Sequence, residues 1–458
     1  MLRRWKSGLR GRFESLRSGQ ALHVGPLSLV RRRHLSNLLH RLRQAERQIA
    51  DQGGFNALPL RSVEDDVAAG GRSVLFLHNA YYNFLHLAAA LRRRGWDAVS
   101  VSIEDPSGPS ASFYHGEDVN LFDADPELYR RKIEDFYATV AERFRMVHFY
   151  GRGHMSFFPA FFDNSEHYDV LPADFMNLRQ RGVKIGYTVC GCLDGVAQSS
   201  VHRWSGACDK CVWQHEPAVC SDRRNLAWGH KVQSYCDLIA TEGFPALDFQ
   251  DTEKCFREPL TSALDPEFWK PDLVVPERFR LARRPGELVV CHAVGNLQLR
   301  SRNGRNLKGS DAVIEAVERL KREGVDVRLE FLTNMSSTDV RFIQVQADVI
   351  VDQLNYGRYG AMARESMMLG KPTVCFLHKN EPSESRRLAS IEECPLVSAT
   401  ESTIYDVLKG LLADPDRRKQ IGSTSRIFAL KWHAADACAE RFERAYDALF
   451  AGTKAVSQ

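Results

Sequence analysis

Two segments in the C-terminal half of the chain carry residue types that suit phosphate and nucleoside binding. In the first, Arg305 and Lys308 lie in a loop between a predicted strand, Glu287–Val294, and a predicted helix, Asp311–Glu323. Two cations at the carboxyl end of a strand suit a diphosphate leaving group, because they offset the negative charge that develops as its bond breaks. Either cation taken alone would more often be a solvated surface charge.

The second segment, residues 347–376, places glycines before a predicted helix and a glutamate inside it. Backbone N–H groups at a glycine-rich helix start form an anion site, so the backbone of Gly357, Gly360 and Ala361 is expected to line a substrate-binding site. A buried Glu365 that faces the same cleft would accept hydrogen bonds from the hydroxyls of a ribose. A glycine-rich turn alone is equally compatible with a plain helix–strand pair.

Together these segments resemble the C-terminal domain of retaining GT-B glycosyltransferases, the group known as glycosyltransferase family 4. The resemblance implies transfer of a sugar from a nucleotide-diphosphate-sugar donor with retention and without a catalytic metal. It also implies that Arg305 and Lys308 bind the donor pyrophosphate, and that Glu365 holds the ribose hydroxyls. The first glutamate of the family motif falls on Gly357, so the carboxylate that contacts the donor sugar is missing here.

In the N-terminal half, the resemblance points to residues near the acceptor. The family places a His-Gly pair after a strand, but here the predicted strand Lys184–Val189 leads into Cys190. His148 and His154 flank another predicted strand end and are alternative residues for lining the cleft. Asn79 and the loop after it correspond to the family's first loop, which meets the acceptor. Histidines in such positions are more often structural than catalytic.

Four cysteines between residues 192 and 220 have the clustering of a metal site. A C-x₂-C pair with two further thiols nearby, in a chain without an export signal, predicts a structural zinc ion in tetrahedral coordination. An insertion of about thirty residues buries little core of its own, so a metal would stabilise it. The alternatives are unliganded thiols with incidental spacing, or Cys190 or a histidine in one ligand position. The predicted ligands are Cys192, Cys208, Cys211 and Cys220.

These residues need strands and helices that hold them at the edges of sheets. A strand over residues 73–78, a helix over 84–94 and a strand over 98–103 form a βαβ unit, which builds parallel sheets. The predicted fold is α/β of the GT-B type, with two Rossmann-like parallel-sheet domains that face a ligand-binding cleft. The predicted divisions are a basic helical arm over 1–54, an N-terminal acceptor domain over 72–263 with a cysteine-rich insertion over 190–220, a linker over 264–286, a nucleotide-sugar-binding domain over 287–430, and a C-terminal helix over 431–458 that crosses back.

The net charge of +4 over 458 residues conceals an uneven distribution. Residues 1–50 contain 12 Lys or Arg and two Glu, a net charge of +10, which leaves −6 for the rest of the chain. Apolar residues three and four apart in this segment predict basic amphipathic helices. Such an arm suits packing on the body or a second subunit, and it equally suits an anionic membrane surface. The acidic body argues against a nucleic-acid partner.

The N-terminus has charges where a secretory signal needs an apolar core, and no apolar run approaches the roughly 18 residues that span a bilayer. We therefore expect reduced thiols and a cytoplasmic protein, peripheral at the inner face of the membrane if the arm binds lipid.

The expected function is that of an enzyme, a glycosyltransferase that acts on a hydroxyl acceptor such as a glycan or lipid-linked glycan in cell-surface polysaccharide assembly. Gly357 and Cys190 favour an alternative, a non-catalytic GT-B module that binds nucleotide or glycan. The cysteine cluster and the basic arm favour a zinc-dependent nucleic-acid-binding protein. A sugar epimerase on the same fold is a further alternative.

Overall fold

The structure is a computed structural model, and it supports description of most of the chain after the arm. The predicted arm, Asn79 and His154 lie outside the described residues. The described residues are 71–77, 82–107, 116–151, 157, 173–241, 245–250, 254–256, 262–301, 303–379 and 388–452.

The first sheet is parallel and has seven strands in the order β3-β2-β1-β4-β5-β6-β7. Its strands are β1 Ser73–Leu77, β2 Asp97–Ser102, β3 Val119–Asn120, β4 Met146–Tyr150, β5 Lys184–Thr188, β6 Leu238–Ala240 and β7 Cys255–Phe256. The apolar strand β1 is buried throughout and lies between β2 and β4, with Val74 opposite Ala98 and Met146. The chain extends to one side of β1 and then returns to the other, so the switch point of this sheet lies between β1 and β4.

The second sheet is also parallel and has four strands in the order β11-β10-β8-β9. Its strands are β8 Leu288–Val294, β9 Val327–Thr333, β10 Val349–Val351 and β11 Thr373–Val374. The chain moves from β8 to β9 on one side and then to β10 on the other side of β8. The switch point of this sheet therefore lies between β8 and β10. The two sheets confirm the predicted fold class of two parallel-sheet α/β domains.

Helices connect the parallel strands, and a side chain caps the start of four of the described helices. The α-helices are α4 Asn83–Arg93, α5 Pro126–Arg143, α6 Ala173–Gln180, α7 Gln198–Ser205, α8 Asp222–Tyr235, α9 Leu297–Arg300, α10 Ser310–Arg322, α11 Ser337–Gln344, α12 Ala361–Met368, α13 Ala389–Glu392, α14 Ile404–Ala413, α15 Pro415–His433 and α16 Ala435–Phe450. Three short 3₁₀ helices are η2 Ala207–Lys210, η3 Val212–His215 and η4 Glu277–Phe279. Asp125 caps α5 by accepting hydrogen bonds from the amides of Glu127 and Leu128, and Pro126 occupies the first turn.

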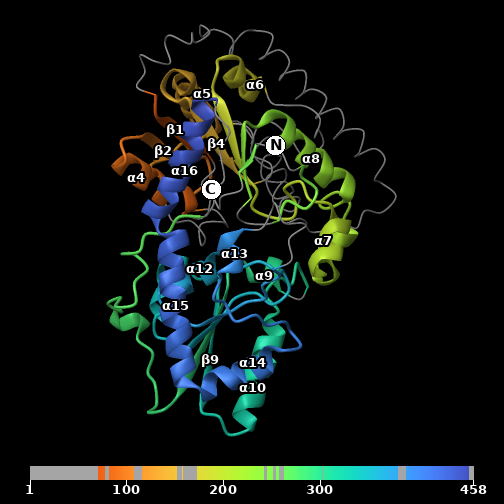
Figure 1. Cartoon of the computed structure of the whole chain (residues 1–458), viewed down its shortest axis with the longest axis vertical. Helices are drawn as coiled ribbons and strands as arrows, with labels where there is room; N and C mark the ends of the chain where they lie inside the picture. Colours follow the sequence, from red (N-terminus) through yellow and green to blue (C-terminus); the bar gives the residue numbers. More distant parts are fainter. Residues whose placement is uncertain are drawn as a thin grey trace, which may run out of the picture. The chain divides into compact units, whose positions relative to one another are not determined.

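The last helix returns to the first sheet, as predicted. Helix α16 packs beside α4 (Figure 1), and its residues Cys438, Phe442 and Tyr446 belong to the same core as Val74 and Phe76 of β1. The isolated bridge between Leu264 and Ala434 joins the chain before this helix to the segment that leaves the first sheet. The first core is therefore complete only when residues more than 350 positions apart in the sequence have met.

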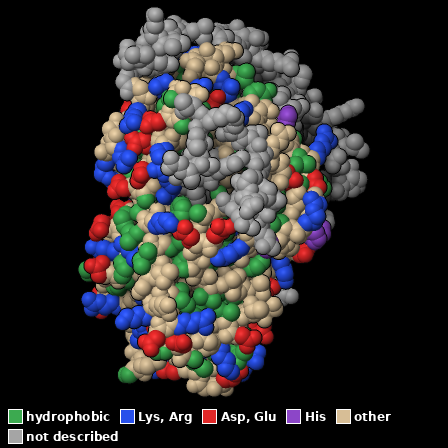
Figure 2. Space-filling view, viewed as in Figure 1, with side chains coloured by type: hydrophobic (Ala, Val, Ile, Leu, Met, Phe, Trp, Pro, Cys, Tyr) green, Lys and Arg blue, Asp and Glu red, His purple; other side chains and the backbone are tan. Residues whose placement is uncertain are grey.

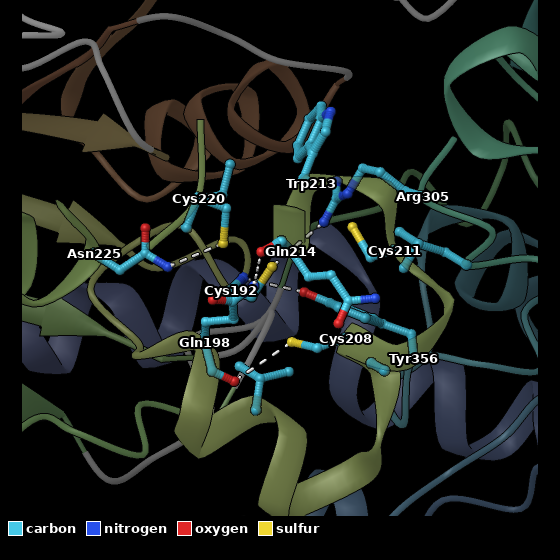
Figure 3. A pocket seen from close by; sticks show the side chains of 14 residues that line it. Cys192, Gln198, Cys208, Cys211, Trp213, Gln214, Cys220, Asn225, Arg305 and Tyr356 are labelled. Carbon is cyan, nitrogen blue, oxygen red and sulfur yellow. Dashed lines mark hydrogen bonds between the residues drawn. The ribbon is translucent and has the colours of Figure 1, made fainter. Parts of the chain in front are cut away.

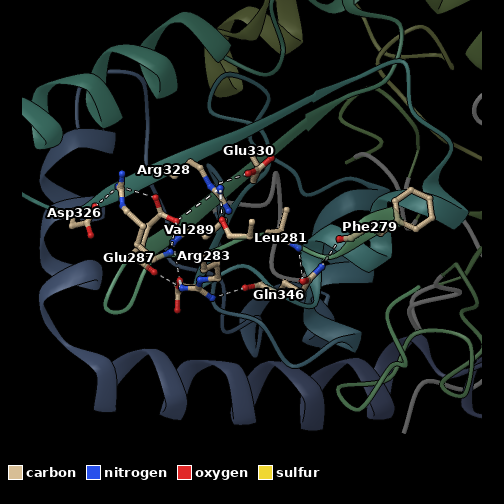
Figure 4. A network of polar contacts seen from close by, with 12 residues as sticks. Phe279, Leu281, Arg283, Glu287, Val289, Asp326, Arg328, Glu330 and Gln346 are labelled. Carbon is tan, nitrogen blue, oxygen red and sulfur yellow. Dashed lines mark hydrogen bonds and ion pairs between the residues drawn. The ribbon is translucent and has the colours of Figure 1, made fainter. Parts of the chain in front are cut away.

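The predicted linker is held against the second sheet in its final third. Figure 4 shows this network, in which the side chain of Gln346 accepts from the amide of Leu281 at 3.0 Å and donates to the carbonyl of Phe279 at 2.9 Å. Arg283 pairs with Asp348, whose carboxylate also accepts from the amide of Val289 in β8. These contacts fix the entry of β8, the strand that leads to the predicted phosphate-binding loop.

The described surface carries mixed charge. On the face shown in Figure 2, Lys and Arg side chains alternate with Asp and Glu over the described residues, without a large area of one sign. None of the helices in the described ranges is both long enough and apolar enough to cross a membrane.

Candidate functional site

The switch point of the second sheet holds a buried ion pair. Lys308 lies in the loop between β8 and α10, and Asp352 lies directly after β10. Their side chains form an ion pair, in which that of Lys308 is 6% exposed and that of Asp352 is 0% exposed. The second oxygen of Asp352 accepts a hydrogen bond of 3.0 Å from the amide of Gly360, at the start of α12. Burial alone would raise the pKa of Asp352, but the charge of Lys308 and these hydrogen bonds hold it below its ordinary value. Asp352 is thus the anion that positions Lys308.

Glu365 lies in α12, and its carboxylate contacts the other domain. The hydroxyl of Tyr82, which precedes α4 of the first sheet, donates a 2.7 Å hydrogen bond to Glu365 Oε1. Glu365 is 3% exposed. Burial raises its pKa to about 7, against the lowering effects of Tyr82 and of the neighbouring Arg364. Functional sites often contain a carboxyl group whose pKa is raised toward neutrality, and Glu365 is such a group at a contact between two domains.

The side chain of Arg305 takes a different direction from that of Lys308, although the two residues are only three positions apart. Its Nη2 donates to Cys192 Sγ at 3.4 Å, and its guanidinium lies 4.7 Å from the ring centroid of Trp213. Its Nε is buried and has no hydrogen-bond partner among the described residues. In the structure Lys308 pairs with Asp352, both of these charges act electrostatically on Glu365, and the side chain of Arg305 turns toward the cysteine-rich insertion.

Trp204 packs against the backbone at position 357, where the resemblance places a carboxylate. Gly357 has a φ of +90°, and a Cβ at this position would lie 3.0 Å from the ring of Trp204. The guanidinium of Arg358 lies over the same ring, 4.8 Å from its centroid, and the ring of His378 lies 4.9 Å away, tilted by 55°. The insertion thus fills the space in which the resemblance places the glutamate. The sequence contained no local signal for this contact, because the two residues are 153 positions apart.

The four predicted zinc ligands line one small cavity, together with Arg305, Tyr356 and Trp213 (Figure 3). Burial and the proximity of the other three thiols raise the pKa of Cys208 to about 12. However, no group of three or more His, Cys, Asp or Glu side chains in the described part of the chain is arranged so that it could hold a metal ion. The structure therefore gathers the cysteines as predicted, but it gives zinc no support.

The residues predicted to lie near the acceptor have different positions in the structure. His148 does not line a cleft: its ring is fully buried, with Nε2 2.8 Å from the Thr188 hydroxyl and Nδ1 2.8 Å from the Tyr446 hydroxyl. Burial lowers its pKa to about 3, so it is a neutral core histidine that links β4, β5 and α16. Cys190 is partly exposed after β5, and its amide donates to Asp194 at 2.7 Å. Tyr82, directly before α4, donates to Glu365, whereas Asn79, assigned to the acceptor, lies outside the described residues.

A cavity of about 490 Å³ lies beside the Lys308 loop, at the carboxyl ends of β8 and β9. Asn306 and Ser310 line it from the loop and the start of α10, and Phe331 and Asn334 line it from β9 and the turn after it. Its volume falls in the range of small-molecule sites, and amides beside an aromatic ring suit a flat, polar, uncharged group. Sequence reasoning missed this cavity, because its walls come from three separate stretches of the chain, 297–301, 306–314 and 331–334.

Comparisons with known proteins agree with the fold. No family model and no curated protein sequence matches the chain. Sucrose-phosphate synthase from Thermosynechococcus elongatus is similar in structure, with a TM-score of 0.53 and 13% identity over 83% of this chain and 100% of that chain. A glycosyltransferase from Rickettsia africae gives 0.47 and 10%, over 82% and 98%. Starch synthase IV from Arabidopsis thaliana gives 0.46 and 10%, over 83% and 99%.

Likenesses at such identities concern the fold alone, and only the first exceeds a TM-score of 0.5. Together with two parallel sheets, each with its own switch point, and a last helix that returns to the first sheet, this likeness defines the architecture as GT-B. The predicted fold is confirmed.

Proposed function

We propose that this protein is a glycosyltransferase that moves a sugar from a nucleotide-diphosphate-sugar donor to a hydroxyl acceptor. The observation that carries the proposal is the position of Lys308, Asp352 and Glu365 at the switch point of the second sheet. Ligands of open α/β sheets bind at such points. A cation, a helix start and a carboxylate there match the phosphates and the ribose of one nucleotide.

The chemistry assigned to each residue follows from its charge. Lys308 offsets the charge that grows on the leaving diphosphate, and Asp352 holds the ammonium group in place until a ligand arrives. Glu365 accepts hydrogen bonds from the ribose hydroxyls. Retention, a glycan or lipid-linked acceptor, a role in cell-surface polysaccharide assembly and peripheral membrane attachment through residues 1–50 are parts of the proposal that rest on the resemblance and on the charge of the arm.

The 490 Å³ cavity is the place proposed for the nucleobase. It adjoins the Lys308 loop through Asn306 and Ser310, so a base in the cavity and a phosphate at Lys308 belong to one extended ligand. Replacing Phe331 with Ala should then weaken the binding of all nucleotides, whereas replacing Asn334 should alter the preference among bases, because the amide contacts a polar edge.

The test is a thermal-shift titration with UDP, GDP and ADP, followed by a donor-hydrolysis assay. A ligand at 100 times its dissociation constant stabilises by about 2.7 kcal/mol. Glu365→Gln keeps the shape and removes the charge, and it should weaken the best nucleotide by about ten- to a hundredfold. Lys321→Ala, on the outer surface of α10, is the control and should change neither readout. Absence of nucleotide binding by the wild type would refute the proposal.

The second candidate is a non-catalytic module on the same fold. It is favoured by Gly357, whose position is blocked by Trp204, and by Arg305, whose guanidinium lies in the insertion. Both candidates predict nucleotide binding, but only the enzyme predicts release of free sugar from a donor. The assay with the nucleotide sugar that binds best, with and without added glycan acceptors, separates them.

Zinc at Cys192, Cys208, Cys211 and Cys220 stays a prediction of the sequence alone. Elemental analysis of protein purified without added metal tests this prediction, and a zinc content well below one ion per chain would refute the prediction. Unliganded thiols would then be expected to titrate with 5,5′-dithiobis(2-nitrobenzoate) once the protein is unfolded without a chelator.

A further inference from the structure

Tyr82 makes a direct connection between the two switch points of the fold. It lies in the connection from β1 to α4, and β1 borders the switch point of the first sheet. Its partner Glu365 belongs to α12, which follows β10 at the switch point of the second sheet. The hydrogen bond therefore spans 283 residues of sequence and joins the two edges at which parallel sheets bind their ligands.

The ring of Tyr82 packs against two other aromatic side chains. The residue is fully buried, and its ring centroid lies 4.8 Å from that of Trp269 and 5.8 Å from that of His86. Trp269 is itself fully buried in the core of the second domain with Met367 and Met368 of α12. A buried aromatic ring between two domains has few rotamers available, so its hydroxyl presents a fixed donor to the carboxylate.

The carboxylate of Glu365 has capacity for a second partner. An ionised carboxylate accepts several hydrogen bonds on two oxygens, and Tyr82 uses one lone pair of Oε1. Within the described residues no further hydrogen bond to this carboxylate is formed. Tyr82 can thus fix the plane of the group while the other oxygen receives a ligand hydroxyl. A protein group that bound both oxygens of Glu365 would instead leave neither of them for the ligand hydroxyl.

We propose that Tyr82 is a positioning residue of the nucleotide site, which orients Glu365 for the ribose hydroxyls and so makes nucleotide affinity depend on contact between the two domains. This inference rests on the proposed function, because it assigns Tyr82 to the same site. It adds a contribution from the N-terminal domain to a site that sequence reasoning built from the C-terminal domain alone.

The charge state of Glu365 supplies a readout that a merely structural role would not change. The groups that face it are Tyr82 before α4, Arg364 in α12, Asp352 after β10 and Lys308 before α10. Burial raises its pKa to about 7, and the hydrogen bond from Tyr82 opposes that rise. Loss of the hydroxyl should therefore move the pKa of Glu365 further up, and the ionised form that accepts from a ribose should persist only at higher pH.

The experiment compares the full-length wild type with Tyr82→Phe, Glu365→Gln, the double variant and a control. The control is Tyr137→Phe, which also removes the hydroxyl of a buried tyrosine; that hydroxyl donates to the carbonyl of Asp174 within the N-terminal domain. Affinity for UDP, GDP and ADP is measured by calorimetry from pH 5.5 to 8.5. The affinity of each variant at each pH is divided by that of the wild type. This ratio removes the titration of the nucleotide's terminal phosphate near pH 6, because that titration is common to all the proteins.

At pH 7.5 Tyr82→Phe should bind the nucleotide about two- to tenfold more weakly than the wild type, with the pH midpoint of binding shifted upward. In the Glu365→Gln background the same change should have no further effect, and Tyr137→Phe should leave affinity and midpoint unchanged. Equal effects of Tyr82→Phe in both backgrounds, or tighter binding in Tyr82→Phe, would overturn the inference while the proposed function stands. Absence of binding by the wild type would overturn both.

Discussion

Comparing Gly357 with Gly95 separates two costs of placing a side chain at a left-handed backbone position, namely backbone strain and overpacking. Gly357 has a φ of +90° and Gly95 a φ of +86°, but a Cβ would meet Trp204 only at Gly357 and would meet nothing within 4 Å at Gly95. Gly95→Ala should therefore cost about 1–2 kcal/mol for backbone strain, and Gly357→Ala about 1–3 kcal/mol more for overpacking. Urea unfolding measures both.

A glutamate introduced at position 357 should not restore the family's carboxylate. The side chain would have to displace Trp204 and leave Arg358 without its stacking partner. We expect Gly357→Glu to lose stability without a gain in donor hydrolysis. Greater hydrolysis in this variant would show that the insertion moves aside more easily than its packing implies.

The Lys308–Asp352 pair should behave as a buried ion pair. Removing one partner leaves an uncompensated buried charge, so Lys308→Met or Asp352→Leu alone should cost about 3–5 kcal/mol, whereas the double variant should recover much of that loss. The matched control is the exposed pair of Lys321 and Glu318 in α10, where Lys321→Met should cost at most about 1 kcal/mol. Chemical denaturation reports stability, and nucleotide titration of the double variant shows whether a recovered fold still lacks the phosphate contact.

At the scale of elements, α16 is a structural part of the first domain rather than a free tail. Tyr446 presents its hydroxyl to His148, which is buried between β4 and its neighbours. Tyr446→Phe leaves a buried ring nitrogen without its partner and should cost about 1–3 kcal/mol. Tyr405→Phe, which removes an exposed hydroxyl that contacts Glu323, should stay within about 0.5 kcal/mol. Similar losses in the two variants would contradict the role assigned to α16.

The insertion should depend on Arg305 for its attachment. Besides the stacking on Trp213, the amide of Val212 donates to the carbonyl of Gly304 at 3.1 Å, and Lys210 pairs with Glu401 at 2.8 Å. Arg305→Ala should therefore loosen η2 and η3 and speed their cleavage in limited proteolysis, with nucleotide affinity changed less than in Glu365→Gln. A large loss of nucleotide affinity with unchanged proteolysis would return Arg305 to the phosphate site that the resemblance assigns it.

At the scale of the whole molecule, buried histidines should set the acid limit of stability. Burial lowers the pKa of His148 to about 3 and of His292 to about 4, and it places that of His433 well below its ordinary value. The unfolded chain binds protons at these residues below about pH 6.5 and the folded chain does not, so stability falls as the pH drops through that range. Thermal unfolding between pH 4.5 and 8 measures the fall.

Glu365 acts in the opposite direction. Its pKa of about 7 in the folded chain exceeds the unfolded value of about 4.3, so its contribution is full below pH 4.3 and is lost as the pH rises to 7. It thus offsets part of the acid loss from the histidines. In Glu365→Gln the fall in stability toward low pH should be steeper than in the wild type, and an unchanged slope would mean that Glu365 is not buried as a neutral acid.

The sequence by itself determined the elements whose signals are local. Apolar periodicity and glycine stops within single segments predict a strand over Met146–Tyr150, a helix over Asp311–Glu323 and a helix over Thr403–Ala413. The structure has the predicted bounds for β4, shifts α10 by one residue at both ends, and starts α14 one residue later. Apolar periodicity did not predict helix α5, although Asp125 as a cap and Pro126 in the first turn are local signals for its start. Glycine as a helix stop predicts a helix over Pro415–Gly422, but α15 continues to His433. Gly422 allows a close approach to the backbone of Gly370, so this glycine serves packing and does not end the helix.

The tertiary structure alone decided which side chains meet at the site. The resemblance placed Arg305, Lys308 and Glu365 in one site, and residue spacing cannot show that a loop turns Lys308 to Asp352 and Arg305 to Trp213. Tyr82 and Glu365 are 283 residues apart, and Trp204 and Gly357 are 153 apart, so neither pair leaves a trace in local periodicity. Local sequence sets φ, ψ and the buried face of each element, whereas side-chain partners depend on the order in which parallel strands assemble, which is a property of the whole sheet.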